Sequence, residues 1–363
     1  MFNSRSYSKW QAMLKQLLPD NCQSRLTNLV LLMVGIFESK SVYLSLLARK
    51  IPIRAKKLSL AKRFERFLDN KAVKVEAWYH LWASWLLQSA SAGGTVHLVI
   101  DSTKVSAYCR KVMVAVAYQR RTLPIMWDWV EHSRGHCTTP FQIALLRRVQ
   151  QLIPADVKVS LVGDGEFNHS LLIEELEFWG WDYALRQKCN TLIMQDHDCE
   201  WHRLDSFGVK RGDMLWLGKA LLTQASPYPT NIVLHWKRDE KVPWFLATNL
   251  LSARPAVRLY KRRMWIEEMF GDMKAHGFDL ELSRLRTPQR LSRLTLVVCI
   301  LYVWLVTTGE FVLKNGLQDE VDRTDRQDLS IFRTGWDWLE RRFALDDPIP
   351  ILFRPDFSLM SGC

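Results

Sequence analysis

The sequence predicts an α/β protein in which a helical N-terminal region precedes a mixed sheet. Apolar residues recur at helical spacing in four segments of residues 1–88, where no strand pattern occurs. Residues 95–187 then show three strands, a helix, a strand, a helix and a strand. The hydrophobic fraction of 48% is that of a globular chain. A length of 363 residues suggests two or three domains.

Positive charge is concentrated at the N-terminal end. Residues 1–90 contain 15 Lys and Arg against 5 Asp and Glu, so they carry +10 of the chain's net +12. This asymmetry favours a polyanionic partner, with an anionic membrane surface as the alternative. The seven cysteines are scattered and form no C-x-x-C pair, which indicates reduced thiols in a cytoplasmic protein.

The N-terminal region is expected to contain helices at about 5–18, 25–38, 57–69 and 75–88, with a short one at 41–49. In the third, Leu60, Phe64 and Phe67 share one face. Basic residues surround its start and occupy its other faces: Lys56, Lys57, Lys62, Arg63 and Arg66. A basic turn followed by a basic helix is a common way to contact phosphates. We therefore predict that residues 1–90 form a DNA-binding domain; the alternative is that these cations only solubilise it.

The first candidate acid follows the first strand. Residues 89–94 are small and predict a flexible domain boundary. The apolar run 95–100 suits a strand in the middle of a sheet covered on both faces, and Asp101 follows it. An Asp at a strand end is usually a turn former, but Ser102 and Thr103 already supply that chemistry here. Strands at 111–118 and 122–130 complete a meander.

The second candidate acid ends the next αβ unit. A helix is expected from Thr139, with Pro140 as its first residue and Gln142 completing a capping box. The strand 157–162 then leads through Gly163 to Asp164, and a helix at 169–179 and a strand at 182–187 follow.

A third cluster lies in the stretch YKRRMWIEEMFGDMK, residues 260–274. On a helix, four of its polar side chains fall within an arc of roughly 60° beside an apolar sector. They are Tyr260, Arg263, Glu267 and Lys274. A carboxylate flanked by cations at the edge of a core can form an active-site wall; the alternative is a charged helix face in water.

The spacing of these four residues resembles the YREK signature of the IS4-like DDE transposases, because all four residue types and all three intervals match. The resemblance implies an RNase H-like core in which Asp101, Asp164 and Glu267 are the catalytic, metal-binding carboxylates. It covers most of the chain and is loose at both termini. Many relatives carry Arg directly after the second aspartate, whereas this chain has Gly165, which puts any role of that Arg in doubt.

The resemblance also implies the chemistry. Three carboxylates suit two Mg²⁺ ions, for which Mn²⁺ can substitute, and such a pair assists in-line displacement at phosphorus. The family cleaves double-stranded DNA at terminal inverted repeats and joins the freed 3′-hydroxyl to target DNA, in cut-and-paste members through a hairpin. Tyr260, Arg263 and Lys274 then contact the DNA end, and two ends are brought together by a homodimer.

A β-rich insertion is expected at 188–250, dividing a catalytic core formed by 95–187 and 251–310. The segment around Trp244 resembles the family segment whose Trp stacks on a flipped base, a contact worth about 1–3 kcal/mol. The alternative is that Trp244 is a core aromatic, with Trp236 as the fallback stacking residue.

The C-terminal region 311–363 is expected to be helical and irregular. A helix should begin near Pro288 and run to about 308. Its apolar run, 294–308, is shorter than the roughly 20 residues of a membrane span, so a buried core helix and no membrane partner are expected. Two other functions stay open: an RNase H-fold nuclease without strand transfer, and a transposase-derived DNA-binding protein without catalysis.

Overall fold

The computed structural model describes residues 4–19, 21–51, 53–105, 108–131, 137–196, 198–323, 325 and 328–360. Five helices come first, close to the expected ranges: α1 (Ser4–Leu17), α2 (Gln23–Ser39), α3 (Leu44–Lys50), α4 (Lys57–Asp69) and α5 (Val75–Ala92). The apolar face predicted for α4 is buried, since Leu60, Phe64 and Phe67 are at most 3% exposed.

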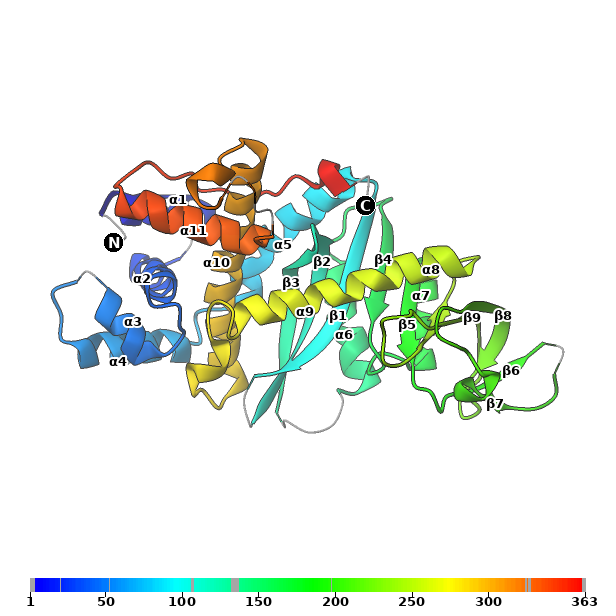
Figure 1. Ribbon diagram of the computed structural model, residues 1–363. Coiled ribbons are helices and arrows are strands. Elements are labelled where there is room, and N and C mark those ends of the chain that lie inside the picture. The colour runs from blue at the N-terminus through cyan, green and yellow to red at the C-terminus, as the bar shows by residue number, and fades with distance from the viewer. Residues whose placement is uncertain are drawn as a thin grey trace.

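The described residues form one ten-stranded sheet with the order β3-β2-β1-β4-β5-β10-β9-β8-β6-β7 (Figure 1). Its first half contains β1 (Thr95–Lys104), β2 (Cys109–Tyr118), β3 (Arg121–Glu131), β4 (Lys158–Gly163) and β5 (Asp182–Gln187). β1 to β3 are an antiparallel meander, and β4 and β5 run parallel to β1. The connecting helices are α6 (Thr139–Gln150) and α7 (Ser170–Phe178). This is the RNase H-like arrangement that was expected.

Two local expectations were wrong. Residues 89–92 are the last turn of α5 and not a flexible linker, because Ala and Ser are tolerated in helices and Ala90 packs into the core. The expected capping box at α6 is also absent: Thr138 is the N-cap, without a side-chain bond. The Gln142 amide instead donates to the carbonyl oxygens of Cys137 and Glu166, both at 3.2 Å.

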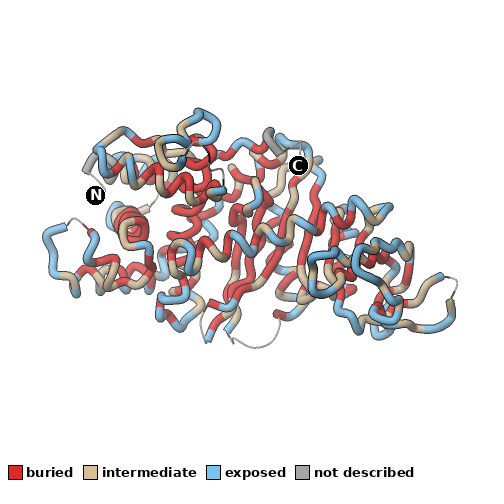
Figure 2. Tube along the Cα trace, viewed as in Figure 1, coloured by how far each residue is buried: buried red, intermediate tan, exposed pale blue. Residues whose placement is uncertain are grey.

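The expected insertion continues the same sheet. Its elements are β6 (Leu192–Gln195), β7 (His202–Arg203), η1 (Leu204–Phe207), β8 (Met214–Leu222), β9 (Tyr228–His235) and β10 (Trp244–Thr248). β10 pairs antiparallel with β5, so the insertion extends the core sheet at its far edge. Its outer loops are exposed, whereas the central strands are buried (Figure 2).

The stretch that carries the third acid crosses one face of the sheet (Figure 1). It comprises α8 (Ala253–Tyr260), a 3₁₀ turn η2 (Lys261–Arg263) and α9 (Met264–Met273), followed by η3 (Leu280–Ser283). The apolar sector predicted for this stretch is buried, with Ile266, Met269 and Met273 at 0% exposure. Lys274, however, lies beyond the helix as its C-cap.

A long central helix joins the N-terminal helices to the sheet. α10 (Pro288–Lys314) is followed by η4 (Gln318–Glu320), α11 (Ile331–Ala344) and η5 (Phe357–Met360). Trp10 of α1 packs edge-on against Trp304 of α10, with ring centroids 4.7 Å apart, so the N-terminal helices share the main core. α10 is long and apolar enough to cross a membrane, but 89% of its most apolar window is buried inside the protein. It is the core helix that was expected.

Candidate active site

Two acids lie where neighbouring parallel strands diverge. The pairing of β1 with β4 ends at Ile100 opposite Gly163, while β1 continues along β2 to Lys104. Asp101 and Asp164 are the next residues of the two strands, so their side chains meet at the same edge. A Cβ at Gly163 would lie 3.0 Å from side-chain atoms of Ile100 and Phe167, so glycine allows the close packing here.

The guanidinium of Arg263 joins these two acids to the third. Its Nη2 lies 3.3 Å from Asp101 Oδ2 and 3.8 Å from Asp164 Oδ2, and its Nη1 donates to Glu267 Oε1 at 2.5 Å. The Asp101 side chain is 6% exposed, whereas those of Asp164 and Glu267 are 32% and 44% exposed. Three carboxylates therefore converge on one cation, and two of them face solvent.

The electrostatics of the cluster follow from burial and like charge. Burial raises the pKa of Asp101 to about 7, Arg263 opposes the rise, and the charges of Asp164 and Glu267 add to it. The backbone N–H of Ser102 donates to Asp101 Oδ1 at 2.7 Å, and that of Glu166 to Asp164 Oδ1 at 2.9 Å. Both aspartates are thus held in fixed orientations.

Neither of the other two residues of the row forms a hydrogen bond or an ion pair with the three acids within the described part of the chain, although Tyr260 is near enough to Arg263 and Asp164 for their charges to act on its pKa. Tyr260 is 1% exposed, and burial raises its pKa to about 12. Its hydroxyl forms no hydrogen bond within the described part of the chain. The Lys274 ammonium donates to the Lys104 carbonyl and pairs with Glu281, both at 2.9 Å. The structure therefore brings Arg263 and Glu267 together with both aspartates but does not add Lys274 to them.

A fourth acid, Glu166, was not predicted as a site residue. Its Oε2 accepts from the Ser102 hydroxyl at 2.5 Å and from Arg110 at 3.0 Å, and its Oε1 accepts from the Cys137 N–H at 2.9 Å. Although burial opposes it, these hydrogen bonds hold the pKa of Glu166 below its usual value. Glu166, two residues after Asp164, is thus hydrogen-bonded to Ser102, the residue after Asp101. In the sequence, the only local indication of this role was the presence of an acid two residues after Asp164.

At Gly165 the space for a side chain exists. A Cβ built there meets nothing closer than Lys188 Cγ at 3.9 Å. The fold therefore does not require glycine directly after Asp164 for lack of space.

The aromatic candidates of the insertion lie differently from what the stacking hypothesis requires. Trp244 is 6% exposed and packs edge-on against Tyr260, with centroids 5.0 Å apart. In this conformation it is the core aromatic of the alternative interpretation, and no base can reach its face. Trp236 is half-buried and lies 5.7 Å from the Arg211 guanidinium. Sequence reasoning did not single out Trp216, which is 38% exposed on β8.

The basic residues predicted to contact DNA surround the start of α4. Lys56 is its N-cap, and Lys56, Lys62 and Arg66 are exposed. Lys57 is half-buried, as is Arg63, whose Nε donates to Asn28 Oδ1 at 2.5 Å. Three of the five cations are thus open to a partner, and Arg63 braces α4 against α2.

Comparison with known proteins assigns the family. The sequence profile of the family described as "Transposase DDE domain" matches residues 92–304, which is more than half of the chain. The chain belongs to this family of DDE transposases. Among solved structures, it is similar to a piggyBac transposase in a synaptic complex with hairpin DNA, studied by cryo-EM. That similarity covers 96% of this chain and 81% of the other, with 10% sequence identity and a TM-score of 0.45. No curated protein matches the sequence.

DDE transposases generally use divalent metal ions, so the donor set must be compared with that requirement. Carboxylate oxygens are the ligands that Mg²⁺ prefers, and Asp101, Asp164 and Glu267 converge on one cationic group. As placed, no three acidic, histidine or cysteine side chains of the described residues form a group that could hold a metal ion. The chemistry of the donors fits, and Arg263 takes the place of a cation among them.

Proposed function

We propose that this DDE transposase is an IS4-like enzyme that cleaves DNA at the ends of an insertion sequence and joins them to target DNA. The observation that carries the proposal is the convergence of Asp101, Asp164 and Glu267 on the Arg263 guanidinium. The family profile spans all three acids, because it matches residues 92–304. A non-catalytic DNA-binding protein would be free to lose these carboxylates.

Asp101, Asp164 and Glu267 are the proposed ligands of two Mg²⁺ ions, with Mn²⁺ as a substitute. If bound there, such ions would supply activation of the attacking water or 3′-hydroxyl and stabilisation of the leaving oxyanion. The residues of the chain orient these groups: the N–H groups of Ser102 and Glu166 fix the two aspartates. The more exposed Asp164 and Glu267 face the side from which DNA can approach.

Arg263, Lys274 and Tyr260 are the proposed contacts to the DNA end. Arg263 can exchange the carboxylates for a phosphate, since a guanidinium binds both groups with the same geometry. Lys274 is 24% exposed and can likewise exchange its ion pair with Glu281 for a contact with a phosphate. The unbonded hydroxyl of Tyr260 is a buried donor that a phosphate or an ordered water would satisfy.

The DNA partners are the terminal inverted repeats and the target. We assign the first contact with the repeats to the exposed cations around α4, namely Lys56, Lys62 and Arg66, with Lys57 and Arg63 beside them. Cut-and-paste transposition through a hairpin, a homodimer that pairs two ends, and a cytoplasmic location on the nucleoid complete the proposal. A flipped base could stack on Trp244 only if the indole ring left its pocket. Trp236 is the alternative stacking residue.

The test uses the purified full chain, a labelled duplex with the element's own end, and Mg²⁺. Glu267→Gln is the matched variant, because it removes one metal-binding charge with little change in shape. We expect the wild type to nick the end or form a hairpin and to join it to a second duplex, and the variant to bind without cutting. Equal cutting by both proteins would contradict the role of Glu267. Cutting without joining would favour a nuclease. If both proteins bound the DNA and neither cut it, a non-catalytic DNA-binding protein would be favoured.

A further inference from the structure

A basic groove lies beside the helix that carries Arg263 and Glu267. It has a volume of about 980 Å³ and is bounded by the β2–β3 turn, by α8 to α9, and by the end of α10 with the start of α11. Five cations line it: Arg120, Arg121, Arg258, Lys261 and Arg262. The acids of its lining are Glu268 and Asp328, so cations predominate.

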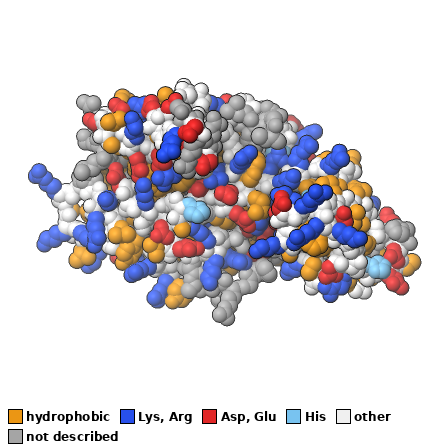
Figure 3. All heavy atoms as spheres, in the orientation of Figure 1, with side chains coloured by type: hydrophobic (Ala, Val, Ile, Leu, Met, Phe, Trp, Pro, Cys, Tyr) orange, Lys and Arg blue, Asp and Glu red, His pale blue; other side chains and the backbone are white. Residues whose placement is uncertain are grey.

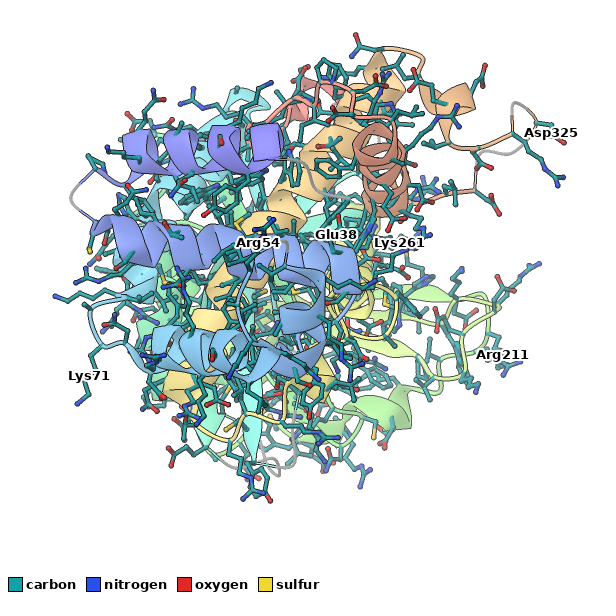
Figure 4. All side chains as sticks on the ribbon, turned by 90° about the vertical axis from the view of Figure 1, so that its left-hand side faces the viewer. Glu38, Arg54, Lys71, Arg211, Lys261 and Asp325 are labelled. Carbon is teal, nitrogen blue, oxygen red and sulfur yellow. The ribbon has the colours of Figure 1, made fainter. Side chains whose placement is uncertain are left out.

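Three of these cations are available to a ligand. Arg120, Arg258 and Lys261 are exposed, and none of them forms an ion pair with another described residue. Lys261 lies between the projecting tips marked by Arg211 and Asp325 in the view of Figure 4. Lys and Arg side chains also gather over α8 in the space-filling view (Figure 3). Like charges so close together, without acidic partners, are typical of a surface that meets a polyanion.

The rim and the floor of the groove are fixed by the fold. Arg121 donates to Asp272 at 2.8 Å and pairs with Glu268 at 3.2 Å, which ties the β2–β3 turn to α9. The floor includes Trp265, whose ring lies 5.9 Å from the Arg262 guanidinium. The groove is therefore preformed and does not depend on a ligand to assemble it.

The turn itself presents its arginine at a conformational cost. Gln119 and Arg120 both have positive φ, 42° and 62°, as in the two-residue turns that favour Asn and Gly. A Gln-Arg pair adopts this backbone less readily than Asn-Gly does. The turn thus carries an exposed arginine at its tip, although Asn-Gly would form this backbone with less strain.

The side of the groove formed by the β2–β3 turn is distant from Asp101, whereas its other side, Lys261–Glu268, adjoins Arg263 and Glu267. Tyr118, which ends β2, lies opposite the start of β1, five residues before Asp101 in the register of the two strands. Five residues of strand span about 17 Å. The rise of B-DNA along its axis is 3.4 Å per base pair, so this distance corresponds to about five base pairs of a duplex whose axis runs along β1.

We propose that this groove, defined by Arg120, Arg258 and Lys261, binds the phosphate backbone of duplex DNA at a second place outside the catalytic cluster. The proposal rests on the proposed function, which supplies the DNA. The bound backbone comes either from the duplex being cut, away from the scissile phosphate, or from a second duplex such as the target. Both sources present the same chemistry, and they can be separated by experiment.

The experiment measures how DNA affinity depends on salt. Each phosphate contact adds about 0.9 to the slope of log K against log salt concentration. The groove variant is Arg120→Gln/Arg258→Gln/Lys261→Gln. The control with the same change of charge is Arg147→Gln/Lys158→Gln/Arg341→Gln, at exposed positions on α6, β4 and α11, outside the N-terminal region. Glu267→Gln is added to every protein so that nothing is cut. All substituted cations are exposed, so the variants should fold.

With a duplex of about 40 base pairs, we expect the groove variant to lower the slope by about 3 and the control to leave it unchanged. An unchanged slope in the groove variant, or an equal drop in both, would overturn the proposal. Cleavage is measured separately on the wild type, in which Glu267 is intact. If the wild type cuts DNA while the groove variant keeps its slope, the groove proposal fails and the proposed function stands. If the wild type neither cuts nor binds DNA, both fail.

A second arm identifies the source of the backbone. The proteins are saturated with a duplex trimmed at the cleavage point, and a second duplex is then titrated in. If the salt slope of the groove variant falls only in this titration, the backbone bound in the groove belongs to a second duplex. If the slope falls only with a long single duplex, the bound backbone belongs to the DNA being cut. Either result supports the groove, and loss in neither arm overturns it.

Discussion

The guanidinium of Arg263 lies 3.3 Å from the carboxylate of Asp101, and both side chains are largely buried, at 13% and 6% exposure. The same guanidinium also reaches Asp164 and Glu267. Arg263 therefore neutralises part of a charge cluster that would otherwise be costly to bury. A divalent cation would neutralise the same cluster, so Arg263 and the metal compete for the same oxygens.

We expect Arg263→Gln to bind Mn²⁺ at least about tenfold more tightly than the wild type when DNA is absent. At an effective dielectric constant near 20, two unit charges about 4 Å apart interact by about 4 kcal/mol, and removal of the competing cation frees part of that energy. Isothermal titration calorimetry of the DNA-free protein measures the affinity. Arg258→Gln, which removes an exposed cation on α8, is the control. Equal affinities in all three proteins would show that Arg263 does not compete with the metal.

Glu166→Gln should destabilise the protein by about 2–3 kcal/mol. The side chain is 4% exposed, and the change leaves the Arg110 guanidinium, 3.0 Å away, without its carboxylate. Urea unfolding gives the free energy. The double variant Arg110→Met/Glu166→Gln should recover part of the loss, because the cation that faces position 166 is removed as well. Additive losses in the double variant would mean that the two side chains act independently.

Much of the fold could be predicted because its signals are local. Apolar runs mark the central strands, and the four-residue spacing of Arg263 and Glu267 places them on one helix face, where they form an ion pair. Lys274 departs from the row because the helix ends one residue earlier. After the helix the chain turns back on it, and an added Cβ at Gly277 would lie 2.2 Å from the Asp272 carbonyl oxygen, so only glycine allows this close approach.

The part that could not be predicted depends on contacts distant in sequence. Glu166 is recognisable only by its partners Ser102, Arg110 and Cys137, which come from three other segments. The basic groove likewise combines the β2–β3 turn with α8 and the end of α10. The burial of Trp244 follows from its pairing in β10 and its contact with Tyr260, neither of which its neighbours in sequence reveal.

Trp244→Ala should reduce the free energy of unfolding by about 3–5 kcal/mol with or without DNA, because it leaves a cavity beside Tyr260. Trp236→Ala, at a half-buried position, should cost much less. Thermal unfolding and end cleavage are measured on both variants and on Trp244→Phe, which keeps most of the packing. If Trp244→Ala retained full stability but lost cleavage, the indole would have to leave its pocket to stack on DNA.

Lys111→Met should stabilise the protein at pH 7 by about 1–3 kcal/mol. Lys111 is fully buried on β2, with its ammonium 3.6 Å from Met273 Sδ and 5.0 Å from the Phe270 ring centroid, and burial lowers its pKa to about 8. It forms no ion pair with another described residue.

The pH dependence of this effect has a definite sign. Below pH 8 both the folded and the unfolded states carry the proton, and the full cost of burying the charge, about 3 kcal/mol, is present. Between pH 8 and 10.5 the folded state releases the proton first, so the cost falls as the pH rises. The stability difference between Lys111→Met and the wild type should therefore be largest at pH 7 and shrink toward pH 10. Denaturant unfolding of both proteins across this range measures it, and Lys104→Met, at an exposed position on β1, should show no such trend. A Lys111→Met variant less stable than the wild type at pH 7 would show that the contacts to Phe270 and Met273 outweigh the cost of burial.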